Sequence, residues 1–409
     1  MNIIKKNHNK LNFFLILGTI LLSGSIYYGC YGQNLLLIPS LMILSIIVAL
    51  HNFELNFNIK IIMYILLILF VVSINPESSH RQVLALLLRL IIALIIISYV
   101  NFEEFSKVFI DIILFISFFS LLFMLIIKLD IQSFLPIAHW KGGGNYRNFI
   151  VFCIRESFIK NKIYRNFGLW WEPGAFQVFI SLAFIFSIIN NTITLKKYFI
   201  FLLVIISTVS STGFIVFGLL SIIFWSNFLK LSKQKFLILI IILALLFTGF
   251  IFILPLVLIK FNSHSNLYPS FLLRYRDLMI SLHMFKDNLL LGSGYGNKNM
   301  LQYYGIKLLG VKNYYLPVPP PGSDGVTLFI ANCGLLSFVL LIPFLYPKYY
   351  LHLSIVYKLI ISISLLVMFN TENFTYLLIF NILTFYGIVG NKQNSIIKPL
   401  IAMPIKGFA

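Results

Sequence analysis

Long apolar runs separated by short polar connections dominate the chain. A helix needs about 20 apolar residues to cross the roughly 30 Å hydrocarbon core of a bilayer, and most of these runs approach that length. On this criterion about twelve spanning helices are predicted, near residues 11–29, 34–50, 61–75, 83–100, 108–127, 173–189, 198–210, 212–229, 236–259, 327–346, 353–370 and 373–389. The pattern therefore predicts an all-α polytopic membrane protein, with residues 1–409 as a single integral membrane domain.

The division at residue 210 decides the orientation of the second half. The polar cluster Ser210-Ser211-Thr212-Gly213 favours a turn inside an otherwise apolar run. The alternative, one long helix from 198 to 229, would reverse the predicted membrane orientation of every later segment. With the division, and with Lys5, Lys6 and Lys10 inside, the basic residues on the short cytoplasmic connections are all lysines, in line with the positive-inside rule.

This topology predicts two large outward-facing loops, 128–172 and 260–326, and places both chain ends in the cytoplasm. The basic N-terminus before an apolar run could also be a signal peptide. More apolar runs follow at once and no small-residue cleavage site stands out, so a first spanning helix is the better interpretation.

The composition excludes several other classes. The chain is 60% hydrophobic and only 11% charged, whereas soluble domains have about 25% charged residues. Its net charge of +19 is not gathered in a basic groove with interleaved aromatics, so no nucleic-acid partner is expected. Three scattered cysteines without a CxxC pair predict neither a disulfide framework nor a metal site.

The arginines have an unusual distribution. None of the seven lies on a predicted cytoplasmic connection: Arg89 falls inside the fourth predicted helix, and the other six lie on outer loops (Arg81, Arg147, Arg155, Arg165, Arg274 and Arg276). The guanidinium fork grips phosphate with two hydrogen bonds, and an arginine within a spanning helix is costly. We therefore expect an anion site, for phosphate, on the outer face. Contact with lipid headgroups, or snorkelling for Arg89, is the alternative.

The segment from Arg165 to Gln177 lies where the first long loop meets an apolar run. Pro173 suits the first turn of a helix, and Glu172 suits the positive end of that helix. The simpler interpretation is an interfacial anchor, with Trp170 and Trp171 in the aromatic belt and Glu172 as the helix cap.

The second long loop carries three further elements. Arg274-Tyr-Arg276-Asp277 opens an amphipathic stretch, which ends in the glycine cluster Leu291-Gly-Ser-Gly-Tyr-Gly-Asn297. Such a cluster lets backbone N–H groups approach an anion, although it more often makes a turn. Asp324 precedes an apolar run at the membrane boundary, where its simpler role is a helix N-cap.

Together these segments resemble bacterial O-antigen and capsular polysaccharide polymerases of the O-antigen polymerase and ligase superfamily. Arg165-Asn-Phe-Gly-Leu-Trp-Trp-Glu172-Pro-Gly-Ala-Phe is similar to the family's Arg…Gly…Glu-Pro-Gly segment. Arg274 and the glycine run that begins at Gly292 resemble its second signature, and Thr208-Val-Ser-Ser-Thr-Gly213 its polar break between helices. The resemblance covers most of residues 160–345.

Two positions depart from the family pattern. Asp324 stands where the family usually has histidine, and Leu289 stands where a proline usually precedes the glycine run. The missing histidine argues more strongly against an O-antigen ligase than against a polymerase.

The resemblance implies a GT-C-like glycosyltransferase in the bacterial inner membrane, with no cofactor and a metal-independent mechanism. It implies an undecaprenyl-pyrophosphate-linked oligosaccharide as donor and another as acceptor, in contact with membrane lipid. A chain-length regulator and a flippase would be further partners. Arg165 and Arg274 would grip the pyrophosphate, with Arg276 and Arg89 as second choices.

The remaining roles are hypotheses as well. Glu172 or Asp324 would take the proton of the acceptor hydroxyl or orient it. Arg147, Arg155 and Trp171 would contact glycan. A transporter or flippase of lipid-linked sugars is the main rival class, but it would show internal repeats and charges at the midplane, neither of which is evident here. A purely structural scaffold would not explain the placement of the arginines.

Overall fold

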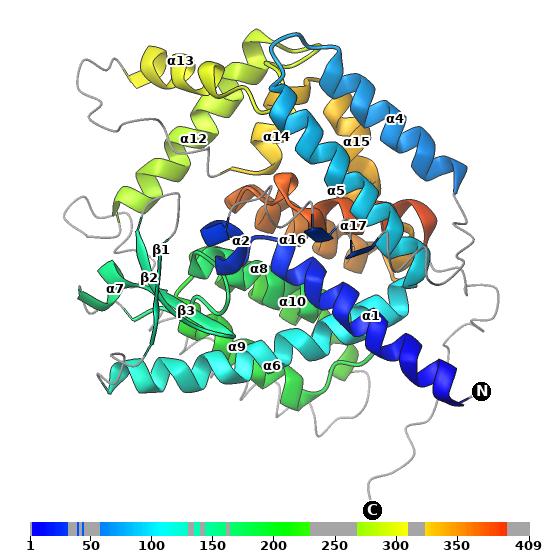
Figure 1. Ribbon diagram of the computed structural model, residues 1–409, viewed down its shortest axis with the longest axis vertical. Coiled ribbons are helices and arrows are strands. Elements are labelled where there is room, and N and C mark those ends of the chain that lie inside the picture. The colour runs from blue at the N-terminus through cyan, green and yellow to red at the C-terminus, as the bar shows by residue number, and fades with distance from the viewer. Residues whose placement is uncertain are drawn as a thin grey trace, which may run out of the picture.

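The computed structural model describes residues 2–31, 39–40, 43–44, 58–129, 135–139, 144–160, 164–229, 268–309 and 324–390, and within these ranges the chain is mostly helical. The predicted span 236–259 lies outside the described residues, as does most of 34–50. Figure 1 shows the arrangement of the elements named below.

The helices fall into a first set before residue 230 and a second set after residue 267. The first set is α1 (Asn2–Leu22), α2 (Ile26–Tyr31), α4 (Ile59–Ser73), α5 (His80–Tyr99), α6 (Phe102–Lys128), α7 (Glu156–Lys160), α8 (Pro173–Ile189), α9 (Leu195–Thr208) and α10 (Ser211–Leu229). The second set is α12 (Tyr268–Asp287), α13 (Lys298–Leu309), α14 (Val326–Cys333), α15 (Leu336–Leu345), η3 (Lys348–Tyr350), α16 (Ile355–Thr371), η4 (Phe374–Tyr376) and α17 (Leu378–Val389).

The predicted division at residue 210 is confirmed. Helix α9 ends at Thr208, and Val209 adopts left-handed backbone angles that terminate it. Ser210 accepts a hydrogen bond on its Oγ from the Gly213 N–H at 3.3 Å, and so holds the start of α10. The polar cluster therefore forms the turn that its composition predicts.

The predicted helix 327–346 is two helices in the structure. Gly334 separates α14 from α15 with a φ of +64°, and its N–H bonds the Ile330 carbonyl at 2.8 Å. A positive φ of this kind suits glycine, because it has no Cβ to clash, and the chain leaves the helix there. The predicted helix 11–29 is likewise interrupted, between α1 and α2, and 373–389 begins with η4.

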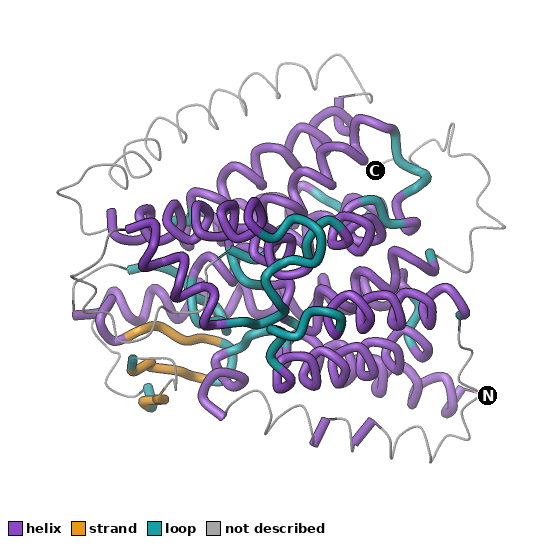
Figure 2. The backbone as a smooth tube through the Cα atoms, turned by 90° about the horizontal axis from the view of Figure 1, so that it is seen from above, coloured by secondary structure: helices purple, strands orange, loops and turns teal. Residues whose placement is uncertain are grey.

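Helix α8 is the centre of the packing. All of its residues from Pro173 to Ile189 are buried, which fits a helix that is apolar all round. It packs against α6, α9, α10 and α16. Figure 2 shows the helices running side by side in layers, with the strands gathered at one end. The start of α8 is therefore held from several sides.

The first long loop contains a small sheet that the all-α prediction did not include. Strands β1 (Ile137–His139), β2 (Asn145–Phe149) and β3 (Phe152–Arg155) pair antiparallel in the order β1-β2-β3. The sheet and α7 lie on the opposite side of the molecule from the beginning of α1 (Figure 1). Strands of three to five residues are too short for a hydropathy pattern to separate from a loop.

Two of the described helices, α5 and α6, combine the length and the apolar composition that a bilayer crossing requires. Several other described helices are equally apolar but shorter, among them α4, α8, α16 and α17. The second long loop contributes α12 and α13, whose composition is far less apolar.

Candidate functional site

An ion pair between Arg274 and Glu372 lies at the start of α8. Arg274, on α12, donates from Nη2 to Oε1 of Glu372 at 2.8 Å. Glu372 follows the last residue of α16, and its side chain is 6% exposed, against 34% for Arg274. The two residues are 98 positions apart in the chain. The fold thus joins the second long loop to a short connection near the C-terminal helices.

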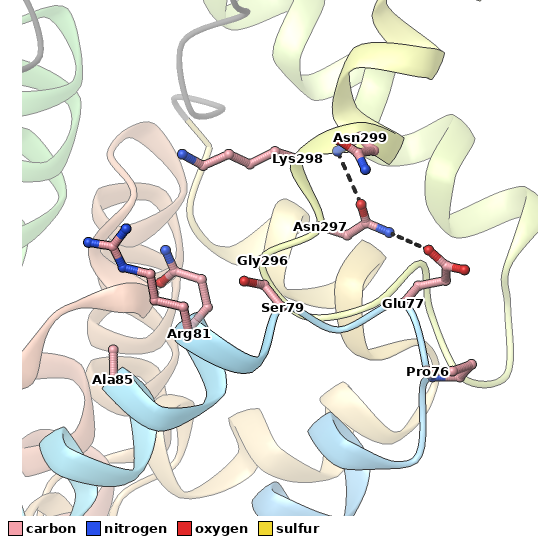
Figure 3. Close-up of a pocket in the computed structure, with 10 residues that line it drawn as sticks. Pro76, Glu77, Ser79, Arg81, Ala85, Gly296, Asn297, Lys298 and Asn299 are labelled. Carbon is pink, nitrogen blue, oxygen red and sulfur yellow. Dashed lines mark hydrogen bonds between the residues drawn. The ribbon is translucent and has the colours of Figure 1, made fainter.

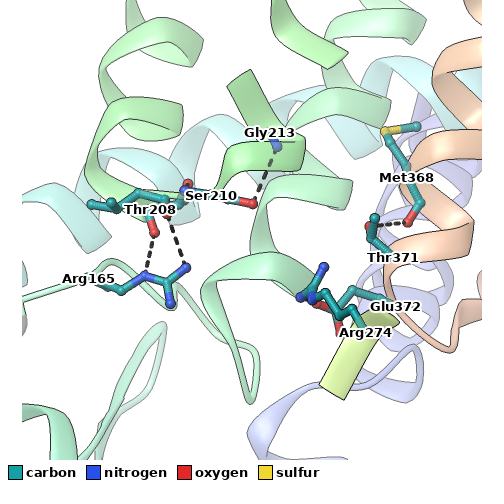
Figure 4. A network of polar contacts seen from close by, with 9 residues as sticks. Arg165, Thr208, Ser210, Gly213, Arg274, Met368, Thr371 and Glu372 are labelled. Atoms are coloured by element: carbon teal, nitrogen blue, oxygen red, sulfur yellow. Dashed lines mark hydrogen bonds and ion pairs between the residues drawn. The ribbon is translucent and has the colours of Figure 1, made fainter. Parts of the chain in front are cut away.

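Arg165 approaches the same region from the segment before α8. Its Nε donates to the Thr208 carbonyl at 3.0 Å, and its Nη2 donates to the Val209 carbonyl at 3.3 Å. Both acceptors lie at the end of α9, where helical carbonyls lack partners within the helix. These two bonds fix the guanidinium and leave donors of its fork for a ligand. Figure 4 shows Arg165, Arg274 and Glu372 converging from three separate segments.

Glu172 completes the group. It occupies the N-cap position of α8, with its backbone carbonyl accepting from the N–H groups of Ala175 and Phe176. Its side chain makes no capping hydrogen bond and is exposed. The interpretation of Glu172 as an ordinary cap is therefore wrong for its carboxylate, which is left for other contacts. Pro173 takes the first helical position, as predicted.

The electrostatics show that these four charges act on one another. Burial lowers the pKa of Arg165 to about 10, while Glu172 and Glu372 oppose that shift and Arg274 adds to it. Burial also lowers the pKa of Arg274, but Glu372 and Glu172 outweigh it and leave the pKa above its ordinary value. Both arginines therefore stay charged at neutral pH.

Glu372 is the titratable member of the group. Burial raises its pKa, and repulsion from Glu172 raises it further, against the lowering effect of Arg274 and Arg165. A carboxyl group with a raised pKa gains and loses its proton closer to neutral pH than an ordinary glutamate. We define Arg165, Glu172, Arg274 and Glu372 as the α8 charge cluster.

Of the sequence-predicted site residues, the structure brings together Arg165, Glu172 and Arg274. It adds Glu372, which the sequence reasoning missed. Glu372 stands between two apolar runs, in the sequence Asn-Thr-Glu-Asn. The available signal was an acidic residue on a predicted outer connection, where its countercharge would be one of the outer arginines.

Arg276 and Asp324 belong to a second group, which is linked through Asp277, the neighbour of Arg276 on α12. Arg276 donates from Nε and Nη2 to Oδ1 of its neighbour Asp277, and both residues are buried. Asp324 accepts from Ser281 at 2.9 Å and from Thr327 at 3.0 Å. Burial raises the pKa of Asp324 to about 6, with Asp277 adding to the effect.

Asp324 is not the N-cap of α14. That position is taken by Gly325, and the Thr327 N–H bonds the side chain of Asn370 at 2.9 Å. Asp324 instead points its Oδ2 at two hydroxyl groups, and its buried Oδ1 has no partner among the described residues.

The remaining predicted residues lie elsewhere. Arg147, on β2, pairs with Glu156 at 3.0 Å and bonds the Leu135 carbonyl. Arg155, on β3, is half-buried and packs beside Gly144. Arg89 is 1% exposed and bonds the Ala85 carbonyl through Nε at 2.8 Å. Its burial is not compatible with snorkelling to the bilayer surface.

The tryptophans do not form an aromatic belt. Trp170 is fully buried and stacks on Phe179 with ring centroids 4.2 Å apart. Trp171 is half-buried, stacks on Phe374 at 5.7 Å, and its carbonyl accepts from Tyr146. Both rings pack the loop onto the helices, so the interfacial-anchor interpretation of this pair is wrong.

The glycine cluster forms a turn that packs on α14, and not an anion cradle. The N–H groups of Ser293 and Gly294 donate to the carbonyls of Ala331 and Asn332, at the end of α14, and the Tyr295 N–H donates to Ser78. The donors of Ser293 and Gly294 therefore satisfy the end of a helix, and that of Tyr295 holds the loop before α5.

No group of three or more metal-binding side chains occurs among the residues that the structure describes. Comparisons with protein-family models, with curated proteins and with solved structures find no match to this chain.

Proposed function

We propose that this chain is a polysaccharide polymerase of the bacterial inner membrane. It would join undecaprenyl-pyrophosphate-linked oligosaccharide repeat units by glycosyl transfer on the outer face of that membrane. The observation that carries the proposal is the convergence of Arg165 and Arg274 with Glu172 and Glu372 at the start of α8. Arg165, Arg274 and Glu172 are the residues that the sequence resemblance singles out, and they lie close together in the fold.

The arginines suit a pyrophosphate leaving group. When the bond between the anomeric carbon and the pyrophosphate oxygen breaks, the electron pair stays on that oxygen and negative charge grows there. Fixed cationic donors in a partly dry site stabilise such charge without reorganising during the step. Arg165 is fixed by two carbonyls and Arg274 by Glu372. The N-terminus of α8 adds its partial positive charge.

Glu172 is the better candidate for the base. The acceptor hydroxyl oxygen forms the new bond to the anomeric carbon, and its proton must pass to a nearby group. Glu172 is exposed and lies within range of both arginine charges. Glu372 is buried against Arg274 and positions it. Asp324 is bonded to Ser281 and Thr327 and lies in the other group.

The membrane architecture is part of the proposal. The segment before α8, the turn between α9 and α10, and the connection after α16 are three connections that the predicted topology places on the outer side. Arg165 donates hydrogen bonds to the turn between α9 and α10, and Arg274 donates one to Glu372 in the connection after α16. Their meeting supports a multi-pass chain of about twelve spans with GT-C-like architecture and both ends in the cytoplasm.

The test is polysaccharide profiling in a strain that lacks the gene and carries wild type, Arg274→Ala or Glu172→Ala. Lys107→Ala, which removes an exposed pair with Glu103 at the predicted inner side, is the matched control. Membrane levels of each protein are measured in parallel. We expect a ladder of long chains with wild type and with the control, and single repeat units with the two site variants.

Two other results would overturn the proposal. Long polymer that accumulates on the lipid carrier without transfer to its final acceptor would identify a ligase of the same superfamily. Repeat units trapped on the cytoplasmic side would identify a transporter. Normal ladders from both site variants at normal protein levels would show that the α8 charge cluster does not carry the reaction.

A further inference from the structure

A polar cavity lies away from the α8 charge cluster, between the start of α5 and the start of α13. Its volume is about 610 Å³, within the range of small-molecule sites. Its polar lining includes Glu77, Ser79, Arg81, Gln82, Asn297 and Lys298. Figure 3 shows the ends of Arg81 and Lys298 on the same side of this pocket.

The lining offers the chemistry of a carbohydrate site. Amide and hydroxyl groups from Gln82, Asn299 and Ser79 can each donate or accept, as sugar hydroxyls require. Asn297 bridges the two sides, since its Nδ2 reaches Glu77 at 3.5 Å and its Oδ1 accepts from two N–H groups at the start of α13. The pocket is therefore built from cross-linked segments and is held in shape.

The charge of the pocket is positive. Its lining contains two basic side chains, Arg81 and Lys298, and one carboxylate, Glu77. Two helices of 20 and 12 residues begin at the pocket, and their N-termini add partial positive charge. Ser79 takes the N-cap position of α5 without a side-chain capping bond, so its hydroxyl is not used on that helix.

A buried arginine, Arg89, is hydrogen-bonded to the backbone of a lining residue. Ala85 lines the pocket, and its carbonyl accepts from Nε of Arg89, one turn deeper on the same helix face. Arg89 is 1% exposed, and neither of its Nη atoms has a partner among the described residues. The hydroxyls of Tyr28 and Tyr295 lie within range of its charge and also lack a partner there.

A buried guanidinium without a counter-ion is costly, and a nearby anion would offset that cost. Tyr295 is adjacent to Gly296 in the chain, and Gly296 is itself a lining residue. Among the described residues, Ala85 on α5 and Tyr295 beside Gly296 thus connect the buried charge of Arg89 to the lining of the pocket.

We propose that this pocket binds a sugar that carries a carboxylate or a phosphate group. The sugar hydroxyls are held by the amides, and the acidic group by Arg81 and Lys298 in the positive field of Arg89. If the chain is a polymerase, this sugar belongs to the repeat unit that it joins. That last step rests on the proposed function, whereas binding to the pocket does not.

The experiment measures binding to the full chain in lipid nanodiscs, with no turnover required. The probes are glucuronate, glucose 6-phosphate, neutral glucose and glycerol phosphate, the last as a mimic of a lipid headgroup. We expect the two acidic sugars to bind and glucose and glycerol phosphate to bind at least tenfold more weakly. Arg81→Gln and Lys298→Gln should each weaken acidic-sugar binding about tenfold.

Lys107→Ala is the control, because it removes an exposed pair outside both clusters, on the predicted inner side, and should leave this binding unchanged. Arg89→Gln tests the buried charge, and its folding is checked by size-exclusion profile. Since Arg81 and Lys298 are exposed, their variants keep the test informative even where Arg89→Gln fails to fold.

Three outcomes would overturn the proposal. The first is no saturable binding of either acidic sugar, and the second is an affinity for these sugars in the Arg81 and Lys298 variants equal to that of wild type. The third is an affinity for glycerol phosphate equal to that for glucose 6-phosphate. The third would assign the pocket to a lipid headgroup. A chain that binds acidic sugars here yet makes no polymer would keep this inference and reject the polymerase.

Discussion

The carboxylate of Glu372 lies over Gly174 and fills the space that a side chain at that position would need. A Cβ built on Gly174 would lie 2.1 Å from Oε1 of Glu372 and 3.2 Å from Nη2 of Arg274. The glycine of the Glu-Pro-Gly sequence is thus the surface on which the ion pair rests. This relationship couples the first turn of α8 to α12 and to the connection after α16.

Gly174→Ala should therefore reduce activity while the helix itself is retained. The new methyl group must displace Glu372, which disturbs the hydrogen bond that positions Arg274. Alanine favours a helix over glycine by about 1 kcal/mol, so the loss would not come from helix propensity. We expect at least about tenfold less polymer, measured on the polysaccharide ladder at matched membrane levels.

Gly218→Ala is the matched control. It lies within α10, and a Cβ there would meet no atom of the described residues within 4 Å. Its polymer output should equal that of wild type. Equal output from Gly174→Ala as well would show that the position of Glu372 over α8 has no part in the reaction.

The raised pKa of Glu372 predicts a pH dependence of anion binding. As pH falls through this raised pKa, Glu372 takes up a proton, its negative charge disappears, and Arg274 becomes available to an anion. Affinity for sulfate, whose own charge stays constant, should thus rise as pH falls from about 9 to about 6. Isothermal titration calorimetry at several pH values measures it.

Glu372→Gln should remove most of that dependence and bind sulfate as tightly at high pH as wild type does at low pH. The amide keeps the size of the carboxyl group, so the space over Gly174 stays filled. An unchanged pH profile in this variant would mean that another group titrates, and Glu372 would lose its assigned role.

The sequence predicted a large part of the helical framework because long apolar runs report burial directly. The helix from Pro173 to Ile189 agrees with its predicted bounds, and the turn at Ser210 lies where the polar cluster placed it. Arg165, Glu172 and Arg274 were expected in one site, and the structure brings them together.

What could not be predicted depends on contacts between distant segments. Glu372 is a single acidic residue between two apolar runs, and only the packing of α12 on α14 and of α14 on α16 gives it Arg274 as a partner. The donors of the glycine turn looked available for an anion until α14 was placed beside them. Arg276 was grouped with Arg274 by proximity in sequence, although its neighbour Asp277 already pairs with it.

Gly292→Ala tests the packing of the glycine turn on α14. Gly292 has a φ of +71°, and a Cβ there would lie 2.3 Å from the Asn332 carbonyl oxygen. The substitution combines backbone strain with overpacking, so we expect a loss of about 1–3 kcal/mol or more in the free energy of unfolding. Thermal unfolding in detergent or nanodiscs measures the change.

Gly305, within α13, provides the comparison as Gly305→Ala, because among the described residues its Cβ would meet only Ile280, at an ordinary 3.6 Å. It should be neutral or slightly stabilising. Similar unfolding temperatures for both variants would show that the turn does not rest on α14 in the way described.

Asp324 predicts the sign of a stability change with pH. Its pKa is about 6 in the folded chain against an ordinary 3.8, because burial and Asp277 disfavour the charged form. Between these values the folded state holds a proton that the unfolded state has released. Stability contributed by this group is therefore present below about pH 4 and is lost as pH rises through about 6.

Asp324→Asn should flatten this part of the profile, because an amide cannot ionise and still fits between Ser281 and Thr327. The apparent unfolding temperature of the variant should fall less than that of wild type between pH 4 and pH 6. Asp111→Asn, at an exposed position on α6, should keep the wild-type slope. If Asp324→Asn keeps that slope too, the carboxyl group of Asp324 is already ionised in the folded chain, and burial does not raise its pKa in the way described.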